Sequence, residues 1–282
     1  MGELVLAAKV THVPSLMLSE QLEPLKGTRD GPIHSLKTLG ERARERGADT
    51  FVVFDTHWIS NFGFHINANA WHRGTYTSPE APQMVHDVSY DFPGNPDLAD
   101  LIAAETARTG PLALAHQVAT LPVEYGTIVP MHYMNRDQAF AVVPIASPVF
   151  ASIDENRRFG AAVRSAIEKS TSKVAVLASG SLSHMLFENS KLGPEAWNRI
   201  ASEFNRQMDL RVLDLWRERR YAEFCAMLPE YTRKCSGEAL MADTVMLFGA
   251  LGWDRFAGAS EQLCDYFPSS GSGQVTVEFH VH

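Results

Sequence analysis

The feature that most constrains this fold is a series of short apolar segments that alternate with segments of helical periodicity. The apolar segments lie at residues 3–10, 51–55, 139–147 and 173–181. Helical spacing of apolar residues is seen between them at 35–47, 96–110 and 155–170. Strands that are apolar along their whole length are buried on both faces, as in a parallel sheet covered by helices. The pattern therefore predicts an α/β fold with three α/β/α layers and a mostly buried central sheet.

The remaining segments add two helices and two strands. A helix is predicted over 194–217, where an apolar stripe begins at Trp197, and another over 239–253. The alternating segments 62–71 and 274–282 read as strands, the first of them pairing beside 51–55. Residues 72–95 and 267–274 look irregular, and long ordered loops in compact domains are often functional.

Composition and charge exclude several classes of function. The 282-residue chain has a formal net charge of −8 and no basic run, so a nucleic-acid partner is not expected. Its longest uncharged apolar stretch, at 140–153, is too short to cross a bilayer, so no membrane partner is expected either. The three cysteines lack CxxC spacing and read as reduced thiols, which is typical of a cytoplasmic protein.

Histidines follow three of the apolar segments at the point where each segment ends. VLAAKVTH leads to His12, VVFDTH to His57, and VAVLASGSLSH to His184. In open α/β sheets, ligands bind beyond the carboxyl ends of the strands. One histidine in such a position is usually a hydrogen-bonded loop residue, but three of them favour a shared site.

Two histidines and one carboxylate form a metal site with open positions, as in non-haem Fe(II) oxygenases. The carboxylate could be Glu238, at the expected start of an apolar helix, where the helix dipole favours an acid. It could also be Asp55, at the end of a predicted strand. Each has a structural alternative: Glu238 as a simple helix-start acid, and Asp55 as a residue that orients His57. The pattern of residues leaves this choice open.

Short motifs along the whole chain resemble those of the class III extradiol ring-cleaving dioxygenases. They are THVPS at 11–15, FDTHW at 54–58, GSLSH at 180–184 and SGEALMADT at 236–244. Each motif is modest alone, but four in this order over a chain of this size are specific. The resemblance implies an oxidoreductase of aromatic-compound catabolism that opens a catechol ring with O₂. It also implies a single catalytic domain over 1–282 and a homo-oligomer.

The resemblance further implies a set of site residues, carried over position by position. Fe(II) would be held by His12, His57 and Glu238, which selects Glu238 over Asp55. His184 would be the catalytic acid and base.

One position of the chain departs from the family pattern. Several members have a second active-site histidine in a DHG motif, whereas this chain reads EYG around Tyr125. We expect Tyr125 either to hydrogen-bond the substrate or to be a partly buried tyrosine with a satisfied hydroxyl.

The resemblance implies that the substrate is a catechol with a carboxymethyl group, for which His132, Ser269 and Ser270 are candidate partners. Another catechol, an aminophenol, or metal-dependent hydrolysis on the same scaffold are the alternatives.

Overall fold

The computed structural model describes residues 1–21, 23, 25–191 and 196–281. In this part of the chain, one large sheet contains, in spatial order, β6 (Ala113–His116), β3 (Phe64–Asn67), β7 (Ala141–Pro148), β2 (Thr50–Ser60), β8 (Lys173–Ser179), β1 (Glu3–Val10), β12 (Val277–Phe279) and β9 (Ser260–Gln262). Two smaller sheets pair β4 (Trp71–Tyr76) with β5 (Val88–Pro93), and β10 (Phe267–Ser269) with β11 (Ser272–Gln274). The helices are α1 (Ser15–Gln21), α2 (Asp30–Glu45), α3 (Pro96–Thr109), α4 (Tyr125–Met134), α5 (Ile153–Lys169), α6 (Glu203–Arg217), α7 (Tyr221–Cys235) and α8 (Ala242–Leu251). Short 3-10 turns occur at η1 (Asn189–Lys191), η2 (Ala196–Asn198), η3 (Glu238–Met241) and η4 (Trp253–Arg255).

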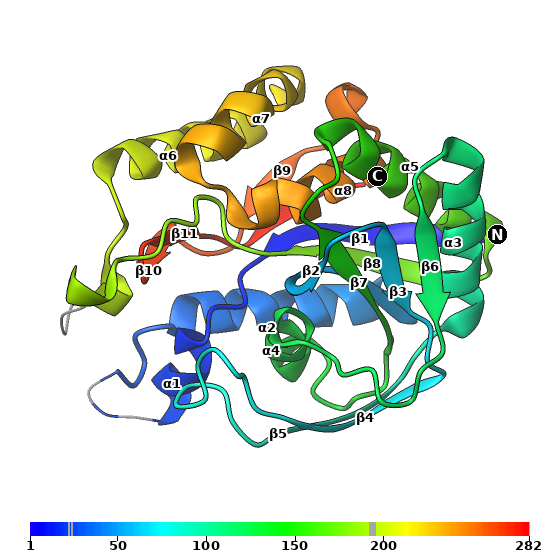
Figure 1. The fold of residues 1–282 in the computed structure, drawn as a ribbon, viewed down its shortest axis with the longest axis horizontal. Helices are drawn as coiled ribbons and strands as arrows, with labels where there is room; N and C mark the ends of the chain where they lie inside the picture. The colour runs from blue at the N-terminus through cyan, green and yellow to red at the C-terminus, as the bar shows by residue number, and fades with distance from the viewer. Residues whose placement is uncertain (22, 24, 192–195, 282) are drawn as a thin grey trace.

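Helices cover both faces of the large sheet (Figure 1). Alternate residues of β2 enter different cores: Val52 and Phe54 pack with α3, α5 and α8, whereas Phe51 and Val53 pack with α2 and α4. All four of these side chains are fully buried. The unbroken apolar strand segments are thus explained by burial on both faces, and the predicted three-layer α/β/α architecture is confirmed.

Four neighbouring strands in the middle of the sheet, β7, β2, β8 and β1, run parallel. Their register places Ser179 of β8 opposite both Val10 of β1 and Asp55 of β2. The carboxyl ends of β1, β8 and β2 therefore meet at one edge of the sheet, and the segments that follow them begin side by side.

Two sequence predictions at the far edge of the sheet were wrong. The strand expected over 62–71 is shorter and pairs with β6 and β7 rather than with β2. Residues 72–95, expected to be irregular, contain the β4–β5 hairpin, in which His72 pairs with Phe92. This hairpin carries many polar residues and only one of its strand faces is buried, so it lacks the apolar runs of the central strands.

Two helix predictions were wrong at their N-terminal ends. The helix expected over 194–217 begins at Glu203, because the Ser202 Oγ atom accepts a hydrogen bond from the Asn205 N–H at 3.1 Å. Residues 194 and 195 lie outside the described residues, and Trp197 belongs to η2. The helix expected over 239–253 begins at Ala242, after the irregular turn η3.

Cys225, Cys235 and Cys264 are free, in agreement with the expected reduced thiols. Among the described residues, no helix combines the length and apolarity needed to cross a membrane.

Candidate active site

The side chains of His12, His57 and Glu238 converge beyond the carboxyl edge of the central strands. One nitrogen of each imidazole and one carboxylate oxygen all lie within 4.8 Å of one another. The Nε2 atoms of both histidines are 3.3 Å from the Oε1 atom of Glu238. The two imidazole rings are nearly perpendicular, with centroids 4.8 Å apart. Residues 226 positions apart in the chain are thus brought together, as the strand-end pattern predicted for the two histidines.

Hydrogen bonding fixes which nitrogen of His12 faces this group. The Ser179 Oγ atom lies 2.9 Å from His12 Nδ1 and donates its own hydrogen to the carbonyl oxygen of Gly126 at 2.5 Å. A carbonyl oxygen can only accept, so the Ser179 hydroxyl must accept the hydrogen of His12 Nδ1. In the neutral form of His12 the lone pair is therefore on Nε2, the atom directed at Glu238, as a metal ligand requires.

A bulge in β2, shaped by Asp55, presents His57. The pairing of β2 with β7 shifts register between Asp55 and Ile59. Asp55 Oδ1 accepts the backbone N–H groups of His57 at 2.8 Å and Trp58 at 3.1 Å, and its Oδ2 accepts the Thr127 hydroxyl at 2.7 Å. Asp55 is thus engaged with the backbone and lies outside the converging group, which matches its alternative role of orienting His57.

Glu238 is 4 % exposed, and both of its oxygens accept hydrogen bonds. Oε1 accepts the Thr56 hydroxyl and Oε2 the Ser181 backbone N–H, each at 2.5 Å. The next three residues, 239–241, have φ angles of 44°, 57° and 61°. Consecutive left-handed residues other than glycine are costly and tend to be kept at functional sites. The turn aims Glu238 into the group and starts α8 behind it.

Charge interactions within the group are strong. Burial would raise the pKa of Glu238, but the charges of His12 and His184 hold it well below its ordinary value. Burial likewise favours neutral His57, yet its contacts with Glu238 and Glu80 raise its pKa to about 10. The Glu238 carboxylate is therefore anionic and attracts positive charge between the imidazoles.

His184 lies beside this group on a segment held by buried hydrogen bonds. Its backbone N–H donates to the carbonyl of Ser236 at 3.0 Å, two residues before Glu238. The preceding residue, Ser183, donates its backbone N–H and its hydroxyl to Asp209, at 3.2 and 2.7 Å. Asp209 is fully buried and also accepts the hydroxyls of Tyr231 and Tyr266. It anchors the segment that carries His184, a role with no signal in the sequence.

Tyr125, the first residue of α4, packs directly against the converging group. Its ring centroid is 3.7 Å from that of His57 and 5.5 Å from that of His12. Its hydroxyl donates to Glu80 at 3.2 Å. Next to it, a Cβ on Gly126 would lie 2.1 Å from an oxygen of Asp55, so this close approach of α4 requires glycine. Tyr125 thus packs on His57 with its hydroxyl directed to Glu80, and its role in binding the substrate stays a prediction.

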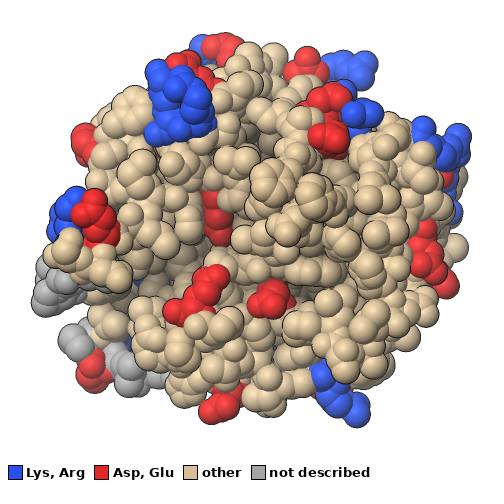
Figure 2. Space-filling view, viewed as in Figure 1, with Lys and Arg blue, Asp and Glu red and all other residues tan. Residues whose placement is uncertain are grey.

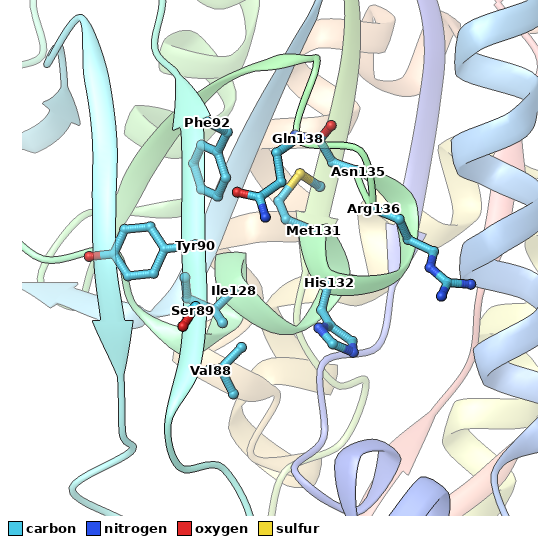
Figure 3. Close-up of a pocket in the computed structure, with 10 residues that line it drawn as sticks. All are labelled: Val88, Ser89, Tyr90, Phe92, Ile128, Met131, His132, Asn135, Arg136 and Gln138. Atoms are coloured by element: carbon cyan, nitrogen blue, oxygen red, sulfur yellow. The ribbon is translucent and has the colours of Figure 1, made fainter.

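His132 lies two helical turns further along α4, about 10 Å from Tyr125 along the axis. It lines a pocket between α4 and β5 with a volume of about 280 Å³. Figure 3 shows this pocket with Tyr90, Phe92 and Met131 on its walls. None of His12, His57, Glu238 or His184 lines it. The position of His132 gives no support to a role in binding the substrate.

The two predicted serines lie in the hairpin formed by β10 and β11. Ser269 is buried, and its Oγ atom lies 3.4 Å from that of Ser15, three residues after His12. Ser270 has a φ of 52°, and its backbone N–H donates to the carbonyl of Trp197. Ser269 thus contacts the segment that follows His12, whereas Ser270 forms part of the turn.

A second group of potential ligands fits a metal ion poorly. Glu261, Glu278 and His280 also lie within 4.8 Å of one another. However, Arg42 contacts both carboxylates, at 2.6 and 2.5 Å, and Arg46 contacts Glu278 at 2.5 Å. Two guanidinium groups already neutralise the two carboxylates, so this group is an ion-pair network between α2 and the C-terminal strands.

The His12, His57 and Glu238 group does fit a divalent metal. Its carboxylate has no Arg or Lys partner among the described residues, and both imidazoles direct Nε2 to the same oxygen. Ligand atoms at right angles around an ion with bonds of about 2.1 Å lie about 3 Å apart, close to the spacing seen here. Figure 2 shows acidic side chains in and beside a hollow near the middle of one face of the molecule. The visible Lys and Arg side chains lie towards the outer edge of that face.

Comparison with known proteins gives the family. Residues 6–280 match the family described as the catalytic LigB subunit of aromatic ring-opening dioxygenase. The chain belongs to the LigB family. It is therefore an extradiol aromatic ring-opening dioxygenase, as the motifs predicted, and the family is metal-dependent. Membership also argues against the alternative of a hydrolase.

Individual relatives and one solved structure match nearly the whole chain. The chain is 48% identical over 261 residues, 92% of its length, to 3,4-dihydroxyphenylacetate 2,3-dioxygenase of Escherichia coli, of which 94% is covered. It is 24% identical to the 2-aminophenol 1,6-dioxygenase beta subunit of a Pseudomonas species, over 99% of this chain and 95% of the relative. The crystal structure of an uncharacterized protein from Escherichia coli K12 has a TM-score of 0.67 at 16% identity, covering 98% of this chain and 99% of that one, and shares the fold.

Proposed function

We propose that this LigB chain opens the aromatic ring of 3,4-dihydroxyphenylacetate with O₂ at a non-haem Fe(II) held by His12, His57 and Glu238. The product would be 5-carboxymethyl-2-hydroxymuconate semialdehyde. The observation that carries the proposal is the convergence of two imidazole nitrogens and one anionic carboxylate within 4.8 Å. The substrate is supported by the 48% identity to the Escherichia coli enzyme of that name.

The bound ion would make the catechol more acidic and supply the redox chemistry that activates O₂. The chain contributes the orientation of the ligands. Ser179 holds the His12 ring, the Asp55 bulge holds the backbone of His57, and Thr56 with Ser181 holds Glu238.

His184 is proposed as the group that moves protons. Its backbone N–H donates to the carbonyl of Ser236, which places His184 on a segment beside Glu238. In this role its imidazole accepts a proton from a catechol hydroxyl and later returns it to the opened product. Proton transfer by a positioned side chain typically contributes about 10²–10⁴ in rate. Tyr125, whose ring packs on His57, would form a wall of the substrate site.

Oxygen uptake tests the proposal directly. Protein loaded anaerobically with Fe(II) should consume one O₂ per molecule of 3,4-dihydroxyphenylacetate and form a yellow product. A panel of substrates that includes 2-aminophenol would show whether the chain acts instead on an aminophenol, the compound class in the name of the relative that is 24% identical. No oxygen uptake with any member of the panel would contradict the proposal. His184→Ala should keep its iron and lose most turnover, and unchanged rates would remove His184 from the mechanism.

We also propose that the chain, as one catalytic domain, assembles as a homo-oligomer. Large apolar side chains are exposed around the edge strand β6: Leu112 and Leu114 are 58% and 42% exposed, and Phe62 and Phe150 are 74% and 73% exposed. The rings of Phe62 and Phe150 stack on each other with centroids 6.0 Å apart. Light scattering after gel filtration gives the mass in solution, and a monomer at micromolar concentration would contradict this proposal.

A further inference from the structure

A buried arginine lies beside the candidate active site. Arg29 directly precedes α2, and its side chain is only 3 % exposed. Its guanidinium carbon lies 5.0 Å from the ring centroid of Trp197 and 4.7 Å from that of Phe267. A charge in such surroundings is costly unless hydrogen bonds or an opposite charge replace water.

The acceptors that Arg29 contacts are all neutral. Nε donates to Ser15 Oγ at 3.2 Å and Nη1 to Asn198 Oδ1 at 3.3 Å. Nη2 donates to the carbonyls of Trp197 and Pro268 at 3.3 and 3.1 Å. Since a guanidinium has five N–H groups, one on Nη1 is left for a further acceptor. In the described part of the chain no carboxylate pairs with Arg29, and burial lowers its pKa to about 10.

Two short connections join Arg29 to the site. Ser15, its Nε partner, follows His12 by three residues, and three residues span at most about 10 Å. The Ser15 hydroxyl also lies 3.4 Å from that of Ser269. On the other side, Ser272 donates its hydroxyl to the Ser269 carbonyl and forms a β-bridge with His184. The group of Arg29, Ser15 and Ser269 is thus connected through short segments to His12 on one side and to His184 on the other.

We propose that Arg29, with the hydroxyls of Ser15 and Ser269, binds the carboxylate of the substrate's side chain and so selects acidic catechols. The inference rests on the proposed function and names the residue that sets its substrate class. A guanidinium matches a carboxylate in charge and in geometry. A para-substituted catechol carries its acid at the end of the ring opposite the two hydroxyls. The substrate could therefore reach the His12 group with one end and Arg29 with the other.

The test compares an acid with its neutral analogue. Wild-type enzyme loaded with Fe(II) is assayed by oxygen uptake with 3,4-dihydroxyphenylacetate and with 3,4-dihydroxyphenylacetamide, and 4-methylcatechol serves as a second neutral substrate. We expect kcat/KM for the acid to exceed that for the amide about 100-fold, mainly through KM. Equal values for acid and amide would overturn the role of Arg29 while leaving ring opening intact. No turnover of any of the three would instead refute the proposed function.

Variants then assign the preference to Arg29. In Arg29→Gln the acid-to-amide ratio of kcat/KM should fall to near 1. Arg29→Lys should keep an intermediate ratio, because the charge remains without the planar fork. Arg44→Gln, an exposed arginine of α2 paired with Asp137, is the matched control and should keep the wild-type ratio. A wild-type ratio in both Arg29 variants, whatever their total activity or stability, would show that Arg29 only clamps the surrounding loops and would overturn the proposal.

Discussion

The Nδ1 atom of His12 lies 2.9 Å from the Oγ atom of Ser179, which joins the segment after β1 to the end of β8. This contact holds the His12 ring with Nε2 facing Glu238. We predict that Ser179→Ala lowers the affinity for Fe(II) about 10- to 100-fold, the usual effect of removing such a partner. Anaerobic titration with Fe(II) measures the change.

A buried serine elsewhere provides the control. Ser147 of β7 is fully buried, and its hydroxyl has no hydrogen-bond partner among the described residues. Ser147→Ala should therefore bind Fe(II) as tightly as the wild type. Equal losses in the Ser147 and Ser179 variants would mean that the effect comes from the fold and not from the orientation of His12.

A second prediction concerns the buried carboxylate of Asp209. It accepts four hydrogen bonds from Ser183, Tyr231 and Tyr266, two on each oxygen, and the amide nitrogen of an asparagine could not accept the two made to the oxygen that it replaces. Each unsatisfied buried donor costs about 1–3 kcal/mol, so Asp209→Asn should lower the free energy of unfolding by roughly 2–4 kcal/mol. Turnover should fall as well, because Ser183 precedes His184. Urea unfolding measures the first effect and oxygen uptake the second.

Asp214 on the same helix is the matched control, since its side chain is 43% exposed and pairs with Arg217. Asp214→Asn should leave both the stability and the turnover close to wild type. If Asp209→Asn behaved in the same way, Asp209 would have no role in holding the His184 segment.

A third prediction follows from His72 in the β4–β5 hairpin. Its side chain is buried, and Nε2 lies 3.0 Å from the Val142 carbonyl. Burial lowers its pKa from 6.5 to about 4, although the hydrogen bond to Val142 opposes this. Between these pH values the unfolded chain binds a proton that the folded chain does not. Stability should therefore fall as the pH drops from 6.5 to 4, by up to about 3 kcal/mol from this residue.

Unfolding by urea at pH 7 and pH 5 tests the predicted loss of stability at low pH. His72→Gln keeps an N–H donor for Val142 and removes the titration, so it should lose less stability than the wild type between the two pH values. His86→Gln changes a histidine whose side chain is 52% exposed and should follow the wild type. Identical pH dependence in all three proteins would show that His72 is not held in its neutral form.

The parts of the fold that the sequence predicted are those whose environment is uniform. Strands β1, β2, β7 and β8 are buried on both faces, so each appears as an unbroken apolar run. The β4–β5 hairpin was missed because its strands carry charged and aromatic residues on an exposed face. The start of α6 was misplaced because the apolar stripe continues back to Trp197, while the N-cap at Ser202 decides where the helix begins.

The candidate site likewise contains residues that the sequence could predict and residues that it could not. His12, His57 and His184 could be predicted because each follows an apolar strand, and the parallel register then brings strand ends together. Glu238 was selected over Asp55 only through the resemblance, since its orientation depends on three left-handed residues that no periodicity reveals. Ser179 and Arg29 were missed because their partners lie far away in the sequence, and contacts of this kind depend on how elements pack.

In the proposed site, His12, His57 and Glu238 hold one iron ion, with Asp55 outside its ligand shell. Iron content after anaerobic loading and desalting tests it most directly. We predict about one Fe(II) per chain in the wild type and in Asp55→Asn, since an amide oxygen can still accept the backbone N–H groups that shape the bulge. Glu238→Ala and His12→Ala should retain almost no iron. Full iron in Glu238→Ala, together with its loss in Asp55→Asn, would show that Asp55 rather than Glu238 is the carboxylate ligand.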